Sequence, residues 1–244
     1  MTRHRLDELL VQRGLYGSRS RARDAIARGT VTVDGIVAAK PAQNTSLESR
    51  IEILDEARAY VSRSALKLKN GISFFNISVK GLNCLDIGAS TGGFTQVLLE
   101  QGAAHVTAID VGHGQLDASL QSNPNATSIE GLNARDLTPA YLKYKIDLIV
   151  CDVSFISLKL ALPAALTLAG SGTRLLALIK PQFEAGRDAI GRGGIVSDPS
   201  EHERVCREIS NFLTAENWRV LGLTPAAIEG GDGNKEFLIA AVKN

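Results

Sequence analysis

From residue 62 to the end of the chain, short apolar runs alternate with segments in which apolar residues recur every three or four positions. The first pattern is typical of buried strands and the second of amphipathic helices. Strands are expected in NCLDIG, HVTAID, ATSIE, IDLIVCD, TRLLALIKP, WRVLGLT and KEFLIAAVK. Helices are expected between most of them, in GGFTQVLLEQG, GQLDASLQ, SLKLALPAALTLA and SEHERVCREISNFLTAEN. This alternation predicts a doubly wound, mainly parallel sheet of the α/β class, in which ligands bind at the carboxyl ends of strands.

The first 57 residues follow a different pattern. RLDELLVQRGL has apolar residues at helical spacing, and a second helix is expected after Ser18, whose side chain can cap it. Alternating residues around Asp34-Gly35 then indicate a β-hairpin. We therefore expect a small α+β domain over residues 1–57, a short linker over 58–61 and a large domain over 62–244.

The composition is that of an ordinary soluble globular protein, with 44% hydrophobic and 22% charged residues. No apolar run is long enough to cross a bilayer, and the N-terminus lacks the apolar stretch of a signal peptide. The three cysteines, Cys84, Cys151 and Cys206, show neither metal-ligand spacing nor a disulfide framework. These features predict a cytoplasmic protein with no membrane partner, and no obligate protein partner is evident.

Basic residues are concentrated near the N-terminus, where residues 1–40 hold eight Lys or Arg against four Asp or Glu. Several arginines on one surface can replace the counterions of RNA phosphates, and the scarcity of aromatic residues there favours backbone contact over base reading. A solvated helix face is the alternative. The candidate RNA-binding residues are Arg5, Arg19, Arg21, Arg23 and Arg28.

A glycine-rich turn follows the first strand expected in the large domain, in the sequence CLDIGASTGGFTQ. Asp110 closes the next strand, 22 residues after Gly88, which is where nucleotide-binding folds place an acid that bonds ribose hydroxyls. Ser90 stands where a dinucleotide-binding turn has its second glycine, so the turn fits S-adenosylmethionine better than a nicotinamide cofactor. The alternative is a turn that only packs a helix on the sheet.

Further along, Asn133 or Asp136 could accept a hydrogen bond from the adenine amine, although capping a helix is an equally good role for this segment. The cofactor-binding residues expected on these grounds are Gly88, Ser90, Gly92, Gly93, Phe94, Asp110, Asn133 and Asp136.

Charged residues also close several of the later strands. Asp152, Lys180 and Glu236 occupy such positions, and Lys67 lies upstream of the first strand. The place where base-amine methyltransferases carry an Asn/Asp-Pro-Pro-aromatic run reads CDVSFIS, without proline. A lysine beside another cation loses its proton more readily and can act as a base toward a hydroxyl group. Surface salt bridges are the alternative for each residue alone.

Two parts of the chain resemble known families. The N-terminal segment, through ARGTVTVDG, resembles the S4-like RNA-binding domain first described in a ribosomal protein. VSRSALKL, CLDIGASTGGFTQVLLEQGAAHVTAIDVGHGQL, CDVSFISL and LIKPQFEAG resemble the TlyA family, also called hemolysin A, whose members join an S4-like domain to an FtsJ-like methyltransferase.

This resemblance implies a Rossmann-like, class I S-adenosylmethionine-dependent methyltransferase that modifies the 2′-hydroxyl of cytidine ribose in ribosomal RNA within ribosomal subunits. It also implies a catalytic tetrad, which falls on Lys67, Asp152, Lys180 and Glu236. RAYV at the domain boundary is similar to the interdomain tetrapeptide of the family, with Tyr60 in place of the usual Trp. A pore-forming haemolysin and a non-catalytic RNA-binding protein are the alternative functions.

Overall fold

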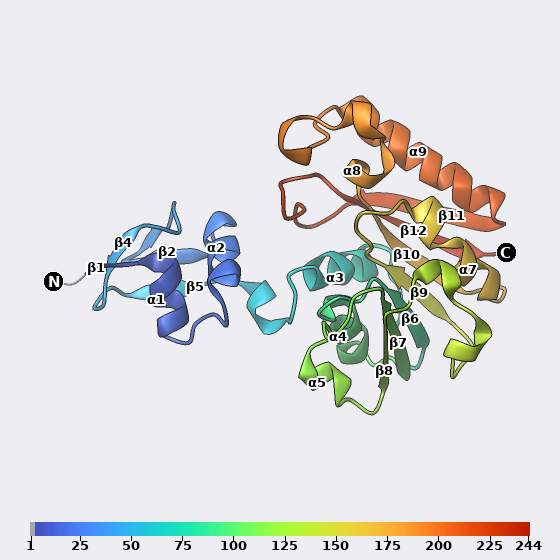
Figure 1. Cartoon of the computed structure of the whole chain (residues 1–244), viewed down its shortest axis with the longest axis horizontal. Coiled ribbons are helices and arrows are strands. Elements are labelled where there is room, and N and C mark those ends of the chain that lie inside the picture. The colour runs from blue at the N-terminus through green and yellow to red at the C-terminus, as the bar shows by residue number, and fades with distance from the viewer. Residues whose placement is uncertain (1–2) are drawn as a thin grey trace. The chain divides into compact units, whose positions relative to one another are not determined.

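The computed structural model describes residues 3–244. The chain forms two compact units, one ending at Ala59 and the other beginning at Tyr60, and each is described by itself (Figure 1). A 3-10 turn, η1 (Glu56–Ala59), lies at the end of the first unit. No helix within residues 3–244 is long and apolar enough to cross a membrane.

The first unit packs two helices against short strands. Its elements are β1 (Arg3–Arg5), α1 (Leu6–Gln12), α2 (Arg19–Ala27), β2 (Val31–Val33), β3 (Ile36–Val37), β4 (Asn44–Ser46) and β5 (Ile51–Ile53). Ser18 caps α2 by accepting a hydrogen bond from the Arg21 amide, as expected. Asp34 and Gly35 both have positive φ, which suits the tight β2–β3 hairpin and confirms it. The pairing of β1 with β4 was not predicted.

The second unit is built on a seven-stranded sheet with the order β11-β12-β10-β9-β6-β7-β8. The strands are β6 (Asn83–Ile87), β7 (His105–Asp110), β8 (Ala126–Glu130), β9 (Leu148–Cys151), β10 (Arg174–Ile179), β11 (Trp218–Pro225) and β12 (Phe237–Lys243). Each matches one of the seven expected runs, and β11 extends one residue beyond its run, to Pro225. β12 is antiparallel to both of its neighbours, and the other pairs are parallel. The sheet reverses direction of winding between β6 and β9, where such folds bind ligands.

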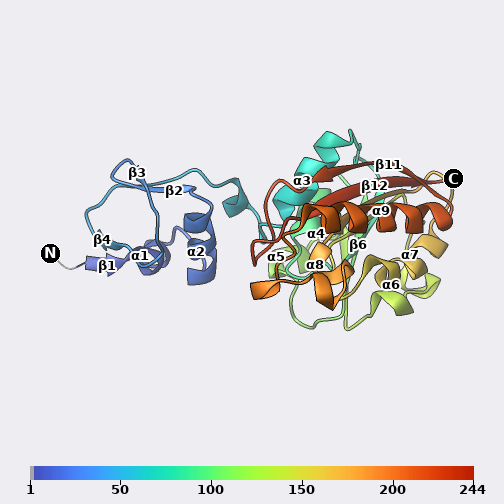
Figure 2. The same cartoon turned by 90° about the horizontal axis from the view of Figure 1, so that it is seen from above.

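Helices cover both faces of this sheet, as the two views show (Figures 1 and 2). On one face, α3 (Ala65–Phe74) and α4 (Gly93–Glu100) bury a cluster that includes Leu68 and Leu98. On the other face, α6 (Leu158–Ala161), α7 (Pro163–Leu168) and α9 (Pro199–Ala215) bury a second cluster around Ile149 and Ile209. The two apolar layers hold the carboxyl ends of the strands in fixed positions.

The remaining helices depart in part from expectation. α3 and the four-residue α8 (Pro181–Glu184) were not predicted. The expected helix over 157–169 is divided into α6 and α7, because Pro163 cannot continue the hydrogen bonding of α6. α5 (Ala118–Gln121) is a single turn, and the 3-10 turns η2 (Ala134–Asp136), η3 (Pro139–Tyr141), η4 (Arg187–Ala189) and η5 (Arg192–Gly194) lie in connections.

Candidate active site

The turn after β6 brings the ends of two strands together. Gly88 has a φ of 81°, and a Cβ there would lie 2.5 Å from the carbonyl oxygen of Asp152 at the end of β9. Any other residue would push the two strand ends apart. Asp110 Oδ2 accepts a hydrogen bond from the Ser90 amide at 2.8 Å, and its Oδ1 accepts one from the Gly112 amide at 2.7 Å. Asp110 therefore fixes the turn as well as facing the cavity beside it.

A cavity of about 570 Å³ opens at this switch point, and we call it the donor cavity. Asp110 and Asn133 supply polar groups to its wall, and Asp152 lies at one end. Much of the remaining wall is apolar, with contributions from Ile87, Ile109, Val111, Leu132, Val153 and Ile156. A carboxylate facing a largely apolar wall suits a ligand that has both a ribose and a flat aromatic base.

The structure separates the expected cofactor-binding residues into three groups. Gly88, Ser90, Asp110 and Asn133 line the donor cavity. Phe94 lines the adjoining cavity described below, whereas Gly92, Gly93 and Asp136 line neither. A Cβ on Gly92 would meet Leu116 and Leu120, and a Cβ on Gly93 would meet Ser62 and Ser64, so close packing within the chain accounts for both glycines. Asp136 is exposed, and Asn133 caps η2 by accepting from the Arg135 amide.

Two smaller cavities continue from the donor cavity. A junction of about 160 Å³ shares Gly88, Ser90, Asp152 and Ser154 with the donor cavity and reaches Lys180. Beyond it, the acceptor cavity of about 240 Å³ shares Ser154 and Lys180 with the junction. Its wall also includes Lys67, Phe155, Gln182, Phe183 and Glu236. Asp152 and Lys180 thus lie where the donor side meets the acceptor side.

The four residues of the expected tetrad form two lysine–carboxylate pairs. Lys67 Nζ donates to Glu236 Oε2 at 2.5 Å, and both side chains are buried. Lys180 Nζ lies 2.7 Å from Asp152 Oδ1 and forms an ion pair with it, although that oxygen accepts no hydrogen bond within the described residues. Lys180 Nζ donates its hydrogen bond to Ser154 Oγ at 2.9 Å. A buried ion pair needs hydrogen bonds to offset desolvation. Lys67 and Glu236 have one between them, whereas Lys180 donates its hydrogen bond to Ser154 instead of Asp152.

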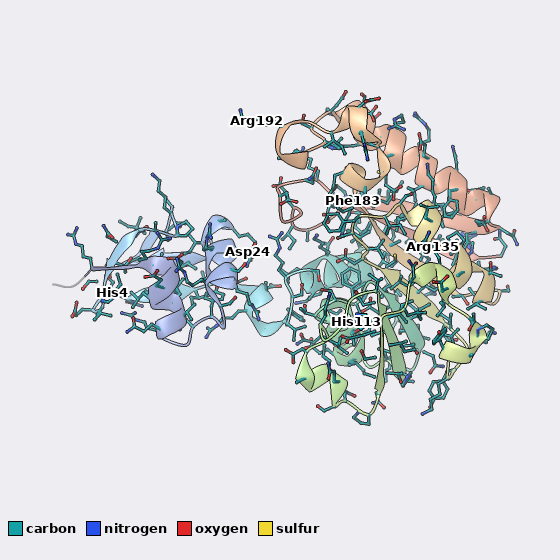
Figure 3. All side chains as sticks on the ribbon, viewed as in Figure 1. His4, Asp24, His113, Arg135, Phe183 and Arg192 are labelled. Atoms are coloured by element: carbon teal, nitrogen blue, oxygen red, sulfur yellow. The ribbon has the colours of Figure 1, made fainter. Side chains whose placement is uncertain are left out.

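Gly230 and Asn234 position Glu236. A Cβ on Gly230 would lie 2.5 Å from Glu236 Oε1, so a larger residue there would displace the carboxylate. Asn234 is buried, and its side chain bonds the Val196 amide and the Gly194 carbonyl, each at 3.0 Å. The segment that carries Glu236 is therefore tied to the glycine-rich loop that precedes α9. Arg192 projects from the tip of that loop (Figure 3).

Asp86 is a further buried carboxyl group beside the site. Its Oδ2 accepts from the Thr95 hydroxyl at 2.7 Å, while its Oδ1 has no hydrogen-bond partner. Burial raises the pKa of Asp86 to about 7, although the hydrogen bond from Thr95 acts in the opposite direction.

Sequence reasoning missed the aromatic and amide residues of the acceptor cavity. Phe155 is 90% exposed, has a φ of 64°, and its ring centroid lies 5.0 Å from that of Phe183 (Figure 3). An exposed phenylalanine with a positive φ stores local strain, which is a common property of binding sites. The detectable signal was an aromatic residue shortly after each of two strand ends, in CDVSFIS and KPQFE.

In the first unit, the candidate RNA-binding arginines differ in their freedom to bind phosphate. Arg5 and Arg19 both bond the buried Asp7 at 3.0 Å and stay about half exposed. Arg28 is largely enclosed and bonds Asp24 and Asp55, each at 2.8 Å, so it is a structural residue. Arg21 is half-buried and donates to the Ala57 carbonyl, and Arg23 is exposed on α2.

Together, the parallel sheet with one antiparallel strand, the cavity at its switch point and the acid at the end of β7 define a Rossmann-like methyltransferase. An FtsJ-like methyltransferase model matches residues 60–243, and an S4 domain model matches residues 4–51. The chain belongs to the TlyA family of FtsJ-like methyltransferases, which confirms the resemblance found in its sequence.

Its relatives agree over nearly the whole chain. It is 43% identical to the 16S/23S rRNA (cytidine-2′-O)-methyltransferase TlyA of Mycobacterium tuberculosis, over 97% of this chain and 89% of the relative. It is 38% identical to Hemolysin A of Brachyspira hyodysenteriae, over 96% of this chain and 98% of the relative. A solved structure from Streptococcus thermophilus, described as a presumed hemolysin, is 39% identical with a TM-score of 0.79, covering 100% of this chain and 90% of that one.

Proposed function

We propose that this protein transfers a methyl group from S-adenosylmethionine to the 2′-hydroxyl of a cytidine ribose in ribosomal RNA. The observation that carries the proposal is the series of adjoining cavities from the donor cavity through the junction to the acceptor cavity, with Asp152 and Lys180 both in the wall of the junction. The relative from M. tuberculosis is named for this reaction. An RNA substrate of this kind places the enzyme in the cytoplasm.

The donor cavity fits S-adenosylmethionine. Asp110 can accept hydrogen bonds from the ribose hydroxyls, because each of its oxygens has a second lone pair besides the one used by a backbone amide. Ile109, Val111 and Leu132 offer an apolar surface to the adenine, and Asn133 lies at the same wall. When bound, the donor supplies an electrophilic methyl group on a positively charged sulfur.

Lys180 is the residue best placed to act on the acceptor hydroxyl. Transfer breaks the bond between sulfur and the methyl carbon, leaves the donor as a neutral thioether, and forms a bond from that carbon to the ribose oxygen. The hydroxyl proton must leave as well, so a base or a proton-steering group must lie at the junction. Lys180 Nζ is fixed there by Asp152 and Ser154. Asp152 orients the Lys180 side chain, whose amine must be unprotonated to accept the hydroxyl proton, and Lys67 and Glu236 form part of the wall of the acceptor cavity. These contacts favour one orientation of the incoming ribose.

RNA binding is assigned to the first unit together with the mouth of the acceptor cavity. Exposed arginines on an S4 domain attract phosphates without reading sequence. Phe155 and Phe183 present aromatic rings to the acceptor side, and unpaired RNA bases stack on such rings.

The proposal is tested by incubating the protein with methyl-labelled S-adenosylmethionine and separated ribosomal subunits, and by mapping the label on the RNA. We expect label on the 2′-oxygen of cytidine and none in a reaction without protein. Label on a base, or no transfer to either subunit, would contradict the proposal. Lysis of erythrocytes that needs neither the donor nor Lys180 would support a pore-forming function instead.

A further inference from the structure

The loop between β7 and α5 forms part of the wall of the donor cavity, through Val111 and Gln115. Glu130 at the end of β8 holds this loop by accepting hydrogen bonds from three consecutive backbone amides, those of Gly114, of Gln115 at 2.8 Å and of Leu116 at 3.0 Å. These bonds, led by the one from Leu116, lower the pKa of Glu130, so its carboxylate stays charged near neutral pH. The backbone of Gln115 is therefore fixed before any ligand binds.

The side chain of Gln115 folds back over Gly112 toward Asp110. A Cβ on Gly112 would lie 2.0 Å from Gln115 Nε2 and 3.2 Å from Asp110 Oδ1, so the amide and the carboxylate are neighbours above the same glycine. Gln115 is exposed, and its side chain forms no hydrogen bond within residues 3–244. His113 marks the position of this loop in Figure 3. A polar group that is accessible, unused and beside the ribose-binding acid is well placed to meet the same ligand.

The geometry points to Gln115 as a second residue that binds the ribose of the donor, through a hydroxyl group that it shares with Asp110. This inference rests on the proposed function, which makes S-adenosylmethionine the donor. A hydroxyl group donates one hydrogen bond and accepts others, so it can donate to Asp110 while it accepts from the Gln115 amide nitrogen. With the amide turned over, Oε1 accepts from a ribose hydroxyl instead. The contact therefore forms with either amide atom toward the cavity.

The other amide in the donor cavity is less available. Two side-chain amides of the described chain line this cavity, those of Gln115 and Asn133. Asn133 Oδ1 already accepts from the backbone amide and from Nε of Arg135, at 3.1 and 3.2 Å. Ile109, Val111 and Leu132 offer only apolar surface. Because a ribose contact is the same before and after the methyl group leaves, Gln115 is expected to bind the donor and the demethylated product equally well.

The test measures binding to the protein without RNA. Isothermal calorimetry with S-adenosylmethionine and with S-adenosylhomocysteine compares the parent with Gln115→Leu and Gln115→Ala. Both variants should bind both ligands about 2- to 10-fold more weakly, the usual range for one hydrogen bond to an uncharged group. Methyl transfer at limiting donor should slow by the same factor. Gln101→Leu is the matched control and should bind as the parent does, since Gln101 is exposed at the end of α4 and lines none of the three cavities.

A double-variant cycle separates a shared ribose contact from a structural role. If Asp110 and Gln115 hold the same hydroxyl group, Asp110→Ala with Gln115→Leu should lose less affinity than the product of the two single losses. Gln115→Leu should also unfold at the parental temperature, because its side chain bonds nothing in the chain. Parental affinity in both Gln115 variants, or losses that multiply fully, overturns the role of Gln115 alone. A parent protein that binds neither ligand overturns the proposed donor, and the role of Gln115 with it.

Discussion

At the residue scale, the candidate chemistry depends on two lysines that are each opposed by a carboxylate from a distant part of the chain. Lys67 and Glu236 are 169 positions apart, yet they form a buried pair. Asp152 and Lys180 follow the ends of β9 and β10 as expected, because parallel sheets gather such ends at one edge. Lys67 lies on α3, and Glu236 directly precedes the antiparallel β12 rather than closing a strand as expected. The pairing was not predictable from spacing, because it depends on how α3 and the segment before β12 pack on the sheet.

Asp110 gives a first prediction at this scale. Asp110→Ala should weaken binding of S-adenosylmethionine by about 10-fold or more, because a charged hydrogen bond contributes about 1–3 kcal/mol. Isothermal calorimetry on the folded variant measures the loss. Asp136→Ala is the matched control, since Asp136 is exposed and lines neither the donor cavity nor the junction. Unchanged affinity for S-adenosylmethionine in Asp110→Ala would show that the ribose does not bind at Asp110.

Asp86 gives a second prediction, which concerns pH. Its pKa in the folded protein is about 7, above the ordinary value of 3.8, so the stability it contributes is present at low pH and is lost as pH rises through 7. Denaturant unfolding of the parent and of Asp86→Asn at a series of pH values measures the effect. The free energy of unfolding of the parent should fall relative to that of Asp86→Asn as pH rises from about 4 to about 7, and the difference should level off above pH 7. Parallel curves would show that Asp86 keeps its charge throughout.

At the scale of elements, α8 holds the loop that follows β9. Glu184 on α8 accepts hydrogen bonds from the Ser157 hydroxyl at 2.6 Å and from the Leu158 amide at 2.7 Å. The loop between Asp152 and Ser157 carries Ser154 and Phe155 into the acceptor cavity. A helix of four residues leaves almost no periodic signal, which is why α8 and its role were not predicted from the sequence although the seven strands were.

Glu184→Ala should therefore loosen this loop. We expect faster hydrogen exchange at the Leu158 amide and slower methyl transfer, with donor affinity reduced less than the rate, because Asp110 remains in place. Glu208→Ala is the control, since Glu208 forms surface pairs with Lys159 and Arg204. Exchange rates and turnover that match those of the control would show that Glu184 does not hold this loop in place.

At the scale of the whole molecule, one unit is suited to hold RNA and the other to carry out the reaction. The sequence predicted this division through the change in hydrophobic pattern and the arginine-rich start. It did not predict which arginines serve the fold. Asp7 is buried, and its charge is compensated mainly by Arg5, with a smaller contribution from Arg19. The hydrogen bond from Arg5 is the main cause that lowers the pKa of Asp7 to about 2.

Arg19→Gln combined with Arg23→Gln should weaken binding to ribosomal subunits and flatten its dependence on salt, because each lost phosphate contact lowers the salt exponent by about 0.7–0.9. Donor affinity should not change. Arg28→Gln should instead destabilise the first unit, since Arg28 holds Asp24 and Asp55. A salt exponent that is identical in the parent and the double variant would show that these arginines are solvent-exposed residues that do not contact RNA.

The central claim is that Lys180 acts on the acceptor hydroxyl where the donor and acceptor cavities meet. Single-turnover methyl transfer to ribosomal subunits, with saturating S-adenosylmethionine, tests it directly in Lys180→Ala and in the control Lys159→Ala, which loses only a partly exposed ion pair. Removing a positioned base typically slows transfer by about 10²–10⁴-fold, whereas losing an exposed ion pair costs about 1 kcal/mol of stability or less. The account predicts that Lys180→Ala folds, binds the donor and transfers at such a reduced rate, while Lys159→Ala matches the parent. Transfer by folded Lys180→Ala at nearly the parental rate would contradict it.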